Sequence, residues 1–508
     1  MASDTISAAT RVRVALLSAI VSILIPAMAQ GATRNVDKAS AACSDTAGAP
    51  FCTIQAAVNA ASPNDRIEIA AGSYIETLTV DRNLTLHGVG ISSIEGACDG
   101  QTNLLGAPAV TVQTGVIVLL TDVTIKGGTA SLGGGIANAG VLFLASSEVC
   151  QNNAFNQGGG IYSTGALSLS RVQVYDNQQA SAGVEGGGLM VAGGRTLVRN
   201  STFTNNRVAR GGAISVAAGA TLVLSRSTLK TNFADGTLPA VVSSQGGGIN
   251  NSGTTIIDQT DVDGNVVIST GGFGGGIFND GDLLMAHSVL RDNGTDHIAG
   301  NPIANGFGGG LYNTGLATIS SSTVSGNVFA FGIVGFGAGI SNVGGTLSLS
   351  NVTITENANA GTGVGGGAGI DISGGSVRVR NSIIARQAVG DDCSLGGLTT
   401  DGYNIDSDGT CGLVSVGAGG TDQPSVADPG LLPLTDNGGP TQTHDLADTS
   451  VAIDAGNPAG CMGDLNGVGA AQIPLRADQR GRVFIEIAGV GADPSSCDIG
   501  AVEFQPAP

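Results

Sequence analysis

The stretch GGGIYSTGALSLSRVQVYDN, residues 158–177, decides the fold because the chain repeats its pattern many times. Each copy opens on Gly-Gly-Gly-Ile, Gly-Gly-Gly-Leu or a looser form, and closes on an Asn three positions after an apolar residue. The Ile or Leu positions are 136, 161, 189, 214, 249, 277, 311, 340 and 370, and the Asn positions are 152, 177, 206, 232, 265, 293, 327 and 357. Each Asn follows its Ile or Leu by 16 to 18 residues, but the next Ile or Leu comes 8 to 18 residues later. A fixed segment therefore alternates with a variable one.

The fixed segment has the period of a β-strand, since apolar and polar residues alternate in residues 167–174 and again in 347–354. Three short strands per repeat predict a coil that closes in about 22–30 residues. One such coil cannot bury its own apolar face, so the coils must stack, each strand pairing with its copy in the next coil. This predicts an all-β parallel β-helix. A β-propeller needs about 40 or more residues per blade, so the repeat is too short for one.

The Gly run and the Asn have separate roles in this coil. The Gly run predicts a corner where the backbone takes a positive φ or passes too close to its neighbour for a side chain. The Asn residues predict a ladder whose side-chain amides bond along the column. We expect a second ladder two positions after the Ile or Leu, through Asn138, Asn251, Asn279, Asn313 and Asn342.

The N-terminus and the charge predict an exported protein. Arg11 and Arg13 precede an apolar run at 14–25, and Ala-Met-Ala at 27–29 has the small-x-small cleavage pattern, so residues 1–29 are predicted to be a signal peptide. A membrane anchor is the alternative, but the run is too short to span a bilayer comfortably. We expect no transmembrane segment in the mature chain, which would be secreted or held at a cell surface. The formal net charge of −19 argues against nucleic acid as a partner.

The eight Cys fit an oxidising destination, and disulfides are expected rather than zinc because no CxxC pair occurs. Short separations favour two local bridges, and the last two Cys form a natural C-terminal pair. In chain order the pairs are Cys43 with Cys52, Cys393 with Cys411 and Cys461 with Cys497, and the remaining Cys are Cys98 and Cys150. The sequence leaves the full connectivity open.

Residues 51–90, FCTIQAAVNAASPNDRIEIAAGSYIETLTVDRNLTLHGVG, resemble the N-terminal helix cap and first coils of the pectate-lyase-like right-handed β-helix superfamily. The apolar spacing at Ile54, Val58 and Ala61 suits a short amphipathic helix that plugs the open end. The resemblance implies a right-handed, single-stranded helix. We expect the β-helix and its N-terminal cap over residues 30–387, and a disulfide-tied C-terminal cap over 388–508.

Two further resemblances concern the protein's class. The Gly-Gly-Gly-Ile-x-Asn repeats resemble those of polymorphic outer-membrane proteins and related bacterial surface proteins. The C-terminal stretches DNGGPTQTHDLADTSVAIDAG (436–456), ADQRG (477–481) and CDIGAVE (497–503) are similar to the choice-of-anchor Q domain. Together they imply a large, exported, adhesin-like bacterial surface protein, with the cell outer membrane as its location. Only five residues follow Glu503, without a sorting motif, so the mode of attachment stays open.

Catalytic residues are hard to find in this sequence. A lyase needs a cation held by carboxylates and a base, and a hydrolase needs carboxylates that face one cleft. The best candidates are Asp371, expected to point outward, with Arg378 and Arg380 on the following strand. The alternative, which we favour, is that these are ordinary solvated charges.

Three groups of residues are candidates for binding a ligand. Arg171, Arg199 and Arg226 precede their Asn by six or seven residues, so they are expected at about the same corner, where they could meet an anionic sugar. Phe329 and Phe331 lie in an apolar variable segment and are expected to be partly exposed. By contrast, Phe273, Phe307 and Phe336 each stand four residues before their Ile or Leu and are expected to stack inside the corner.

Calcium is the only cofactor that the sequence suggests, and we predict none as the first choice. The stretch Asp406-Ser-Asp408-Gly409 alternates oxygen side chains before a Gly, as calcium loops do, and 464–467 has the same flavour. Neither has the distal Glu of an EF-hand, so an Asx turn is the preferred interpretation. The four His are scattered, and His444 is expected to be structural.

The sequence as a whole favours a non-enzymatic exported β-helix for surface display, adhesion or carbohydrate contact, with a glycan or a surface protein as partner. A polysaccharide lyase or glycoside hydrolase is the first alternative, and a purely structural spacer the second. Because length changes fall between the Asn and the next Gly run, the variable loops are expected to lie side by side along one edge of the rod, where a partner would bind.

Overall fold

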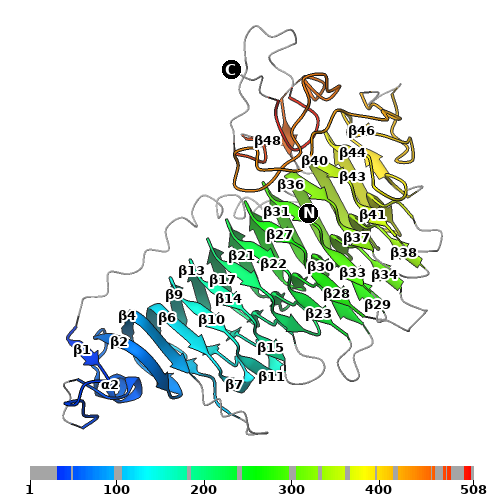
Figure 1. The fold of residues 1–508 in the computed structure, drawn as a ribbon. Coiled ribbons are helices and arrows are strands. Elements are labelled where there is room, and N and C mark those ends of the chain that lie inside the picture. Colours follow the sequence, from blue (N-terminus) through cyan, green and yellow to red (C-terminus); the bar gives the residue numbers. More distant parts are fainter. Residues whose placement is uncertain are drawn as a thin grey trace, which may run out of the picture.

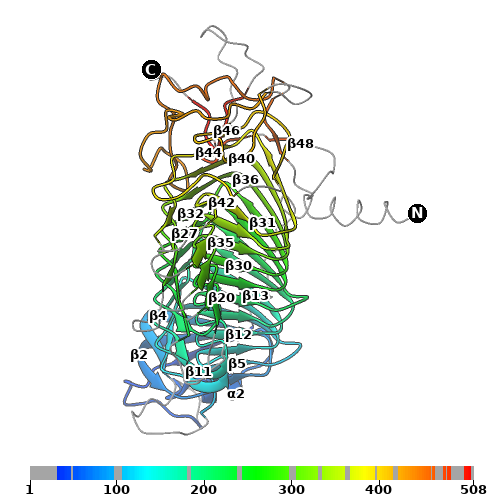
Figure 2. The same ribbon diagram turned by 90° about the vertical axis from the view of Figure 1, so that its right-hand side faces the viewer.

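The computed structural model of the chain is a rod of stacked parallel coils, a right-handed parallel β-helix (Figures 1 and 2). The structure describes residues 31–46, 50–95, 106–179, 185–236, 243–269, 271–296, 305–329, 334–360, 366–394, 398–415, 421–458, 460–463, 473–475, 477–481 and 497–504. The fold class predicted from the repeat is confirmed. The predicted signal peptide lies outside these ranges. Within them, no helix has the length and apolar character needed to cross a bilayer.

The first end of the rod is closed by α2 (Ile54–Ala60), as the sequence predicted. Ile54, Ala57 and Val58 are fully buried against the first coils. The Thr53 hydroxyl accepts the N–H of Ala56 at 3.2 Å and so caps the helix.

Parallel sheets form the walls of the rod in the described residues. The long sheet bends through two sides of each coil. Its strands are β1 (Thr33–Val36), β2 (Arg66–Ile75), β4 (Leu84–Glu95), β6 (Ile117–Lys126), β9 (Val141–Ala145), β10 (Glu148–Cys150), β13 (Ala166–Ser170), β14 (Gln173–Tyr175), β17 (Arg195–Arg199), β18 (Thr202–Thr204), β21 (Thr221–Ser225), β22 (Thr228–Lys230), β26 (Thr254–Asp258), β27 (Asp261–Asp263), β31 (Asp282–Ala286), β32 (Val289–Arg291), β36 (Leu316–Ser325), β40 (Thr346–Thr355), β43 (Ser376–Arg380), β44 (Ile383–Ala385), β45 (Leu398–Thr400) and β46 (Ile405–Asp406).

The corner sheet is the wall that begins at each Gly run. Its strands are β3 (Leu78–Val80), β5 (Val110–Val112), β8 (Ile136–Asn138), β12 (Ile161–Ser163), β16 (Leu189–Val191), β20 (Ile214–Val216), β25 (Ile249–Asn251), β30 (Ile277–Asn279), β35 (Leu311–Asn313), β39 (Ile340–Asn342) and β42 (Ile370–Ile372). Figure 2 shows β5, β12, β20, β30, β35 and β42 following one another along the rod. The repeated Ile and Leu are in register and fully buried in this sheet.

Two narrower sheets complete the coil. The third sheet follows the Asn ladder and comprises β7 (Thr129–Leu132), β11 (Asn153–Gln157), β15 (Gln178–Gln179), β19 (Arg207–Val208), β23 (Phe233–Asp235), β28 (Val266–Ile268), β33 (Gly294–Asp296), β37 (Val328–Phe329) and β41 (Ala358–Asn359). The return sheet brings the variable segments back to the Gly run and comprises β24 (Ser244–Gln245), β29 (Gly271–Phe273), β34 (Asn305–Phe307) and β38 (Val334–Phe336). An antiparallel pair, β47 (Met462–Gly463) and β48 (Ile473–Pro474), lies in the C-terminal region.

The Gly corner has the two properties that the sequence predicted. Gly158, the first Gly of its run, has a φ of 67°. A Cβ on the next residue, Gly159, would lie 2.5 Å from the carbonyl oxygen of Gly187 in the adjacent coil. The first Gly therefore supplies the turn, and the second lets neighbouring coils approach.

The Asn ladder is confirmed. From Asn152 to Asn357, each Nδ2 donates to the Oδ1 of the next Asn at 2.9–3.0 Å. That same Oδ1 accepts the backbone N–H of the preceding Asn at 3.0–3.2 Å. In the second ladder Asn251, Asn279 and Asn313 each donate to the next Asn at 2.7 Å, whereas Asn138 donates to a serine.

A third ladder, of hydroxyl groups, was not predicted. Ser227, Thr260 and Ser288 each accept the backbone N–H of the ladder residue in the preceding coil at 3.1–3.4 Å. Ser and Thr are frequent throughout strand faces, so this column has no distinct signal in the sequence.

Parallel pairing continues past residue 387, because β45 pairs with β43 and β46 pairs with β44. The chain from 421 onward then packs along the side of the last coils, which Figure 1 shows in orange and red. Thr323 donates to the Gln479 side chain at 2.6 Å, and the N–H of Ala501 donates to Thr353 at 3.1 Å. This cover explains why β36 and β40 are rich in Ser and Thr whose side chains are buried on both faces.

The C-terminal motifs meet in one buried cluster of charges. Arg480, from 477–481, contacts Asp445 from 436–456 at 3.0 Å and also contacts Asp478 at 2.6 Å. Its guanidinium also donates to the carbonyl of Glu503, in the third motif. Since the Arg480 side chain is 1% exposed, the motif residues hold the C-terminal region together.

Candidate functional site

The Gly corner brings two columns of outward side chains together. The column after the corner lies on the corner sheet and passes through Ala137, Tyr162, Met190, Ser215, Asn250, Phe278, Tyr312, Ser341 and Asp371. The column before it, which we call the corner strip, comprises Leu132, Gln157, Glu185, Arg210, Gln245, Phe273, Phe307 and Phe336. The side chains of the corner strip are all half-buried, apart from the more exposed Leu132.

Aromatic rings fill the C-terminal half of this corner. Phe307 stacks between Phe273 and Phe336, with 5.6 Å between ring centroids on each side and planes within 14° of parallel. Tyr312 faces them across the corner, 4.9 Å from Phe273 and 6.2 Å from Phe307, and stacks on Phe278 at 5.5 Å. Partial burial raises the pKa of Tyr312, so its hydroxyl stays protonated and can donate a hydrogen bond. We call these rings the aromatic cluster.

The positions of the Phe residues reverse the prediction. Phe329, expected to be partly exposed, is 2% exposed and lies beneath the return sheet. A Cβ on Gly306 or Gly335 would come within 2.3 Å of its ring, so these glycines make room for it. Their neighbours Phe307 and Phe336 consequently face outward, because successive strand residues point to opposite sides. Phe331 lies outside the described residues.

A hollow of about 440 Å³ opens near the other end of the same corner. Tyr162 and Thr164 from one coil, Ala137 from the next and Leu132 from the corner strip line it. Ala137 has only a methyl group where the adjacent coil has Tyr162, and this difference leaves the space. Leu132 is 36% exposed at its rim.

Charges along the corner strip are balanced or withdrawn from solvent. Glu185 and Arg210 form an ion pair at 3.3 Å. Asp371, at the C-terminal end of the second column, is 2% exposed rather than outward as predicted. Ser373 donates to its carboxylate at 2.8 Å and Ser341 at 3.3 Å, and burial raises its pKa.

The three residues proposed for catalysis do not form one site. Asp371 belongs to the corner sheet, whereas Arg378 and Arg380 belong to the long sheet. Both arginines bind Asp401, at 2.6 Å and 3.0 Å, and Arg380 is 7% exposed rather than outward. Their role in the described structure is to pair with a neighbouring carboxylate.

The predicted arginine column is also interrupted. Arg171 and Arg226 occupy the same corner with positive φ, but Asn200 holds that position in the coil between them. Arg199 comes one residue earlier and lies within β17, paired with Ser225 of β21. The one-residue difference in spacing to the Asn ladder, seven residues instead of six, accounts for the displacement.

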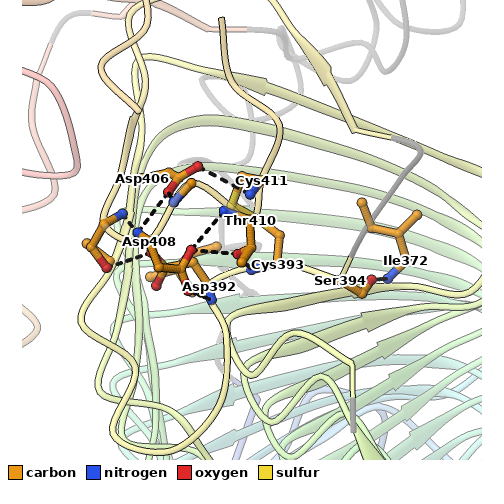
Figure 3. Close-up of a disulfide and its surroundings, with 12 residues drawn as sticks. Ile372, Asp392, Cys393, Ser394, Asp406, Asp408, Thr410 and Cys411 are labelled. Atoms are coloured by element: carbon orange, nitrogen blue, oxygen red, sulfur yellow. Dashed lines mark hydrogen bonds between the residues drawn. A yellow bond between two sulfur atoms is a disulfide. The ribbon is translucent and has the colours of Figure 1, made fainter. Parts of the chain in front are cut away.

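Three carboxylates gather beside the Cys393–Cys411 disulfide, as Figure 3 shows. They belong to Asp392, Asp406 and Asp408, and their ligand atoms lie within 4.8 Å of one another. Asp406 accepts the N–H of Asp408 at 3.0 Å and of Cys411 at 3.2 Å, while Asp408 accepts the N–H of Asp392 at 2.9 Å. Burial raises the pKa of Asp392 to about 6. These bonds match the Asx-turn interpretation, in which the carboxylates organise the loop. The similar stretch 464–467 lies outside the described residues.

The disulfides agree with the predicted pairs. Cys43–Cys52, Cys393–Cys411 and Cys461–Cys497 are bonded. Cys150 is a correction, because it is a free thiol buried in β10, and burial raises its pKa. Cys98 lies outside the described residues.

His444 has the structural role expected from the sequence. Its Nδ1 donates to the carbonyl of Leu432 at 2.7 Å, so Nε2 accepts the hydroxyl of Ser325, 2.9 Å away on β36. Burial lowers the pKa of His444, which keeps the ring neutral in this arrangement.

Comparisons with known proteins identify solved structures of similar fold. No family model matches the chain, and no curated protein matches it. Pectate lyase Pel9A is 15% identical over 94% of this chain and 98% of its own, with a TM-score of 0.38. The structure of XylC with xylose gives 10% identity over 93% and 98%, with a TM-score of 0.40. Dettilon tailspike protein gives 15% identity over 68% and 69%, with a TM-score of 0.28. The chain is similar to these proteins in fold, and at such identities nothing about their ligands transfers to it.

Proposed function

We propose that this chain is an exported, non-enzymatic bacterial β-helix protein that is displayed at a cell surface and contacts glycans there. The observation that carries the proposal is the aromatic cluster, whose three stacked Phe rings are half-buried on the outside of successive coils. A rod without a ligand gains nothing from a row of apolar rings beside water.

Aromatic rings suit a sugar ligand because the C–H face of a sugar ring is apolar and its edge is polar. A Phe ring offers a flat surface for the first, and neighbouring amides and hydroxyls bond to the second. In this corner Phe307 is the central ring, and Tyr312 and Gln245 lie beside it in adjacent columns and coils. The cluster therefore combines stacking and hydrogen-bonding groups.

Export is supported by the features of residues 1–29 and by the three disulfides, which persist in oxidising compartments. Placement at an outer membrane, in the manner of polymorphic outer-membrane proteins, rests on the resemblance of the repeats. We propose further that 436–503 acts as a choice-of-anchor Q-like unit, since its three motifs converge on Arg480.

The enzymatic alternative needs carboxylates and a base around one cleft. In the part of the chain that the structure describes, Asp371 is separated by sheet from Arg378 and Arg380, and both arginines are paired with Asp401. This separation favours the non-enzymatic proposal. A structural spacer is the other alternative, and the exposed aromatic cluster argues against it.

The test is a binding measurement on the secreted protein with a panel of soluble neutral and uronate polysaccharides, followed by an assay for unsaturated and reducing ends. We expect binding without turnover, and Phe307→Ala should weaken binding by about 0.5–1.5 kcal/mol, the usual contribution of an aromatic contact. The matched control is Phe143→Ala, because Phe143 is a half-buried outward ring on the long sheet. Equal binding by Phe307→Ala and the parent, or product formation from any polymer, would overturn the proposal.

A further inference from the structure

The corner strip continues beyond the aromatic cluster, and its composition restricts the ligand further. From the cluster it passes through Gln245, the Arg210–Glu185 pair and Gln157 to Leu132, one residue per coil. At about 4.8 Å per strand the strip is roughly 34 Å long. At its far end the rim of Leu132 borders the hollow beneath Tyr162. Apolar surfaces thus stand at both ends, and amide and charged hydrogen-bonding groups between them.

We propose that this strip binds one uncharged glycan chain lengthwise, with a second subsite in the hollow at Tyr162. The inference rests on the proposed function and extends it by naming the ligand's charge, its direction and a second contact. The hollow offers a Tyr ring beside the hydroxyls of Thr111 and Thr164, the same combination of stacking face and polar edge as the aromatic cluster.

Charge decides between neutral and anionic polymers. The one cation of the strip, Arg210, lies 3.3 Å from the carboxylate of Glu185, so the pair presents no net charge to a ligand. The chain as a whole carries a formal net charge of −19, which repels a polyanion along its whole length. An uncharged chain avoids this repulsion and can accept and donate hydrogen bonds to the strip's amides.

Length follows from the spacing of the two subsites. Tyr162 and the first ring of the cluster, Phe273, are separated by the coils of Glu185, Arg210 and Gln245. A ligand that contacts both must run along the rod rather than around it, since only the axial direction joins them through the strip. A short oligosaccharide can occupy one subsite, whereas a polymer occupies both and gains effective concentration at the second.

The experiment compares the intact protein with Tyr162→Ala and Phe307→Ala, using xylan, glucomannan and dextran as neutral probes, and pectate and alginate as anionic ones. Short neutral oligosaccharides of the best-bound polymer complete the set. Each substitution should weaken polymer binding by about 2- to 10-fold, and Phe143→Ala should leave it unchanged. Phe307→Ala should also weaken binding of short oligosaccharides, whereas the two substitutions together should weaken polymer binding more than either alone.

Several outcomes would overturn the inference. Tighter binding of pectate or alginate than of every neutral polymer contradicts the charge argument. Loss of polymer binding in Phe307→Ala but not in Tyr162→Ala contradicts the second subsite and leaves the proposed function intact. No binding of any polymer by the parent contradicts both. Leu132→Gln, at the rim of the hollow, repeats the test should Tyr162→Ala fold poorly, and it is expected to weaken polymer binding in the same direction.

Discussion

Replacing Asn293 by Leu tests the principle that holds the coils together. The side chain of Asn293 donates to the carbonyl of Val262 at 2.8 Å and to Asn327 at 3.0 Å. Its Oδ1 accepts two bonds from Asn265, one from the backbone N–H and one from Nδ2, both at 3.0 Å. Leu has a similar volume but makes none of these bonds. All of the partners are buried, so water cannot replace the lost group.

Two partners lose their bonds outright in this variant, namely the carbonyl of Val262 and the N–H of Asn265. Asn265 Nδ2 retains the carbonyl of Leu229, and Asn327 Oδ1 retains the N–H of residue 293. At about 1–3 kcal/mol for each unsatisfied buried group, the variant should be destabilised by roughly 2–6 kcal/mol.

Urea unfolding followed by far-UV circular dichroism measures this loss. The matched control is Asn156→Leu, because Asn156 is exposed and its amide bonds only to Ser131 on the surface, so its effect should stay within about 0.5 kcal/mol. If the two variants unfolded at the same urea concentration as the parent, the ladder would not be a source of stability and the argument would be refuted.

Three further perturbations follow from the structure. Burial that raises the pKa of Asp392 from 3.8 to about 6 favours its protonated form in the folded state, so stability should fall by about 3 kcal/mol as pH rises through this range, and Asp392→Asn should flatten that slope in urea titrations at successive pH values. In Gly306→Val the new Cβ would clash with the ring of Phe329, which should cost roughly 1–3 kcal/mol, and a thermal melt should show partial recovery when Phe329→Ala is added. Removing the Cys461–Cys497 disulfide, which closes a separation of 36 residues, should cost the C-terminal region about 4 kcal/mol, seen as earlier proteolysis after residue 421 with the coil signal unchanged.

The sequence predicted the scaffold well because the scaffold repeats. Each coil presents the same Ile, Gly and Asn to the same neighbours, so a constant spacing of 16 to 18 residues is a direct record of the cross-section. The two Asn ladders and the three disulfide pairs followed from position alone. The hydroxyl ladder was missed because Ser and Thr serve many strand positions.

The candidate site was harder to predict because it depends on which side of a strand each residue faces. A shift of one residue reverses that side, and the variable segments have no fixed count from the Asn ladder. Phe329 and Phe307 were therefore assigned to the wrong sides, and Arg199 was placed one position from its true one. The signal that could have corrected the first error is Gly306, whose missing side chain marks the space for a ring.

The direction of the Asn ladder has a consequence for the rod's electrostatics. Every amide donates toward the C-terminal end, so the column of side chains adds its bond dipoles head to tail, as the peptide groups of an α-helix do. At the positive end Asn357 donates to Gln387, and Gln387 donates to the carboxylate of Asp392 at 3.1 Å. An anion thus terminates the column where the aligned dipoles are most positive. The rod has an electrical polarity along its axis, built from uncharged side chains, and its acidic terminus lies beside the Cys393–Cys411 disulfide.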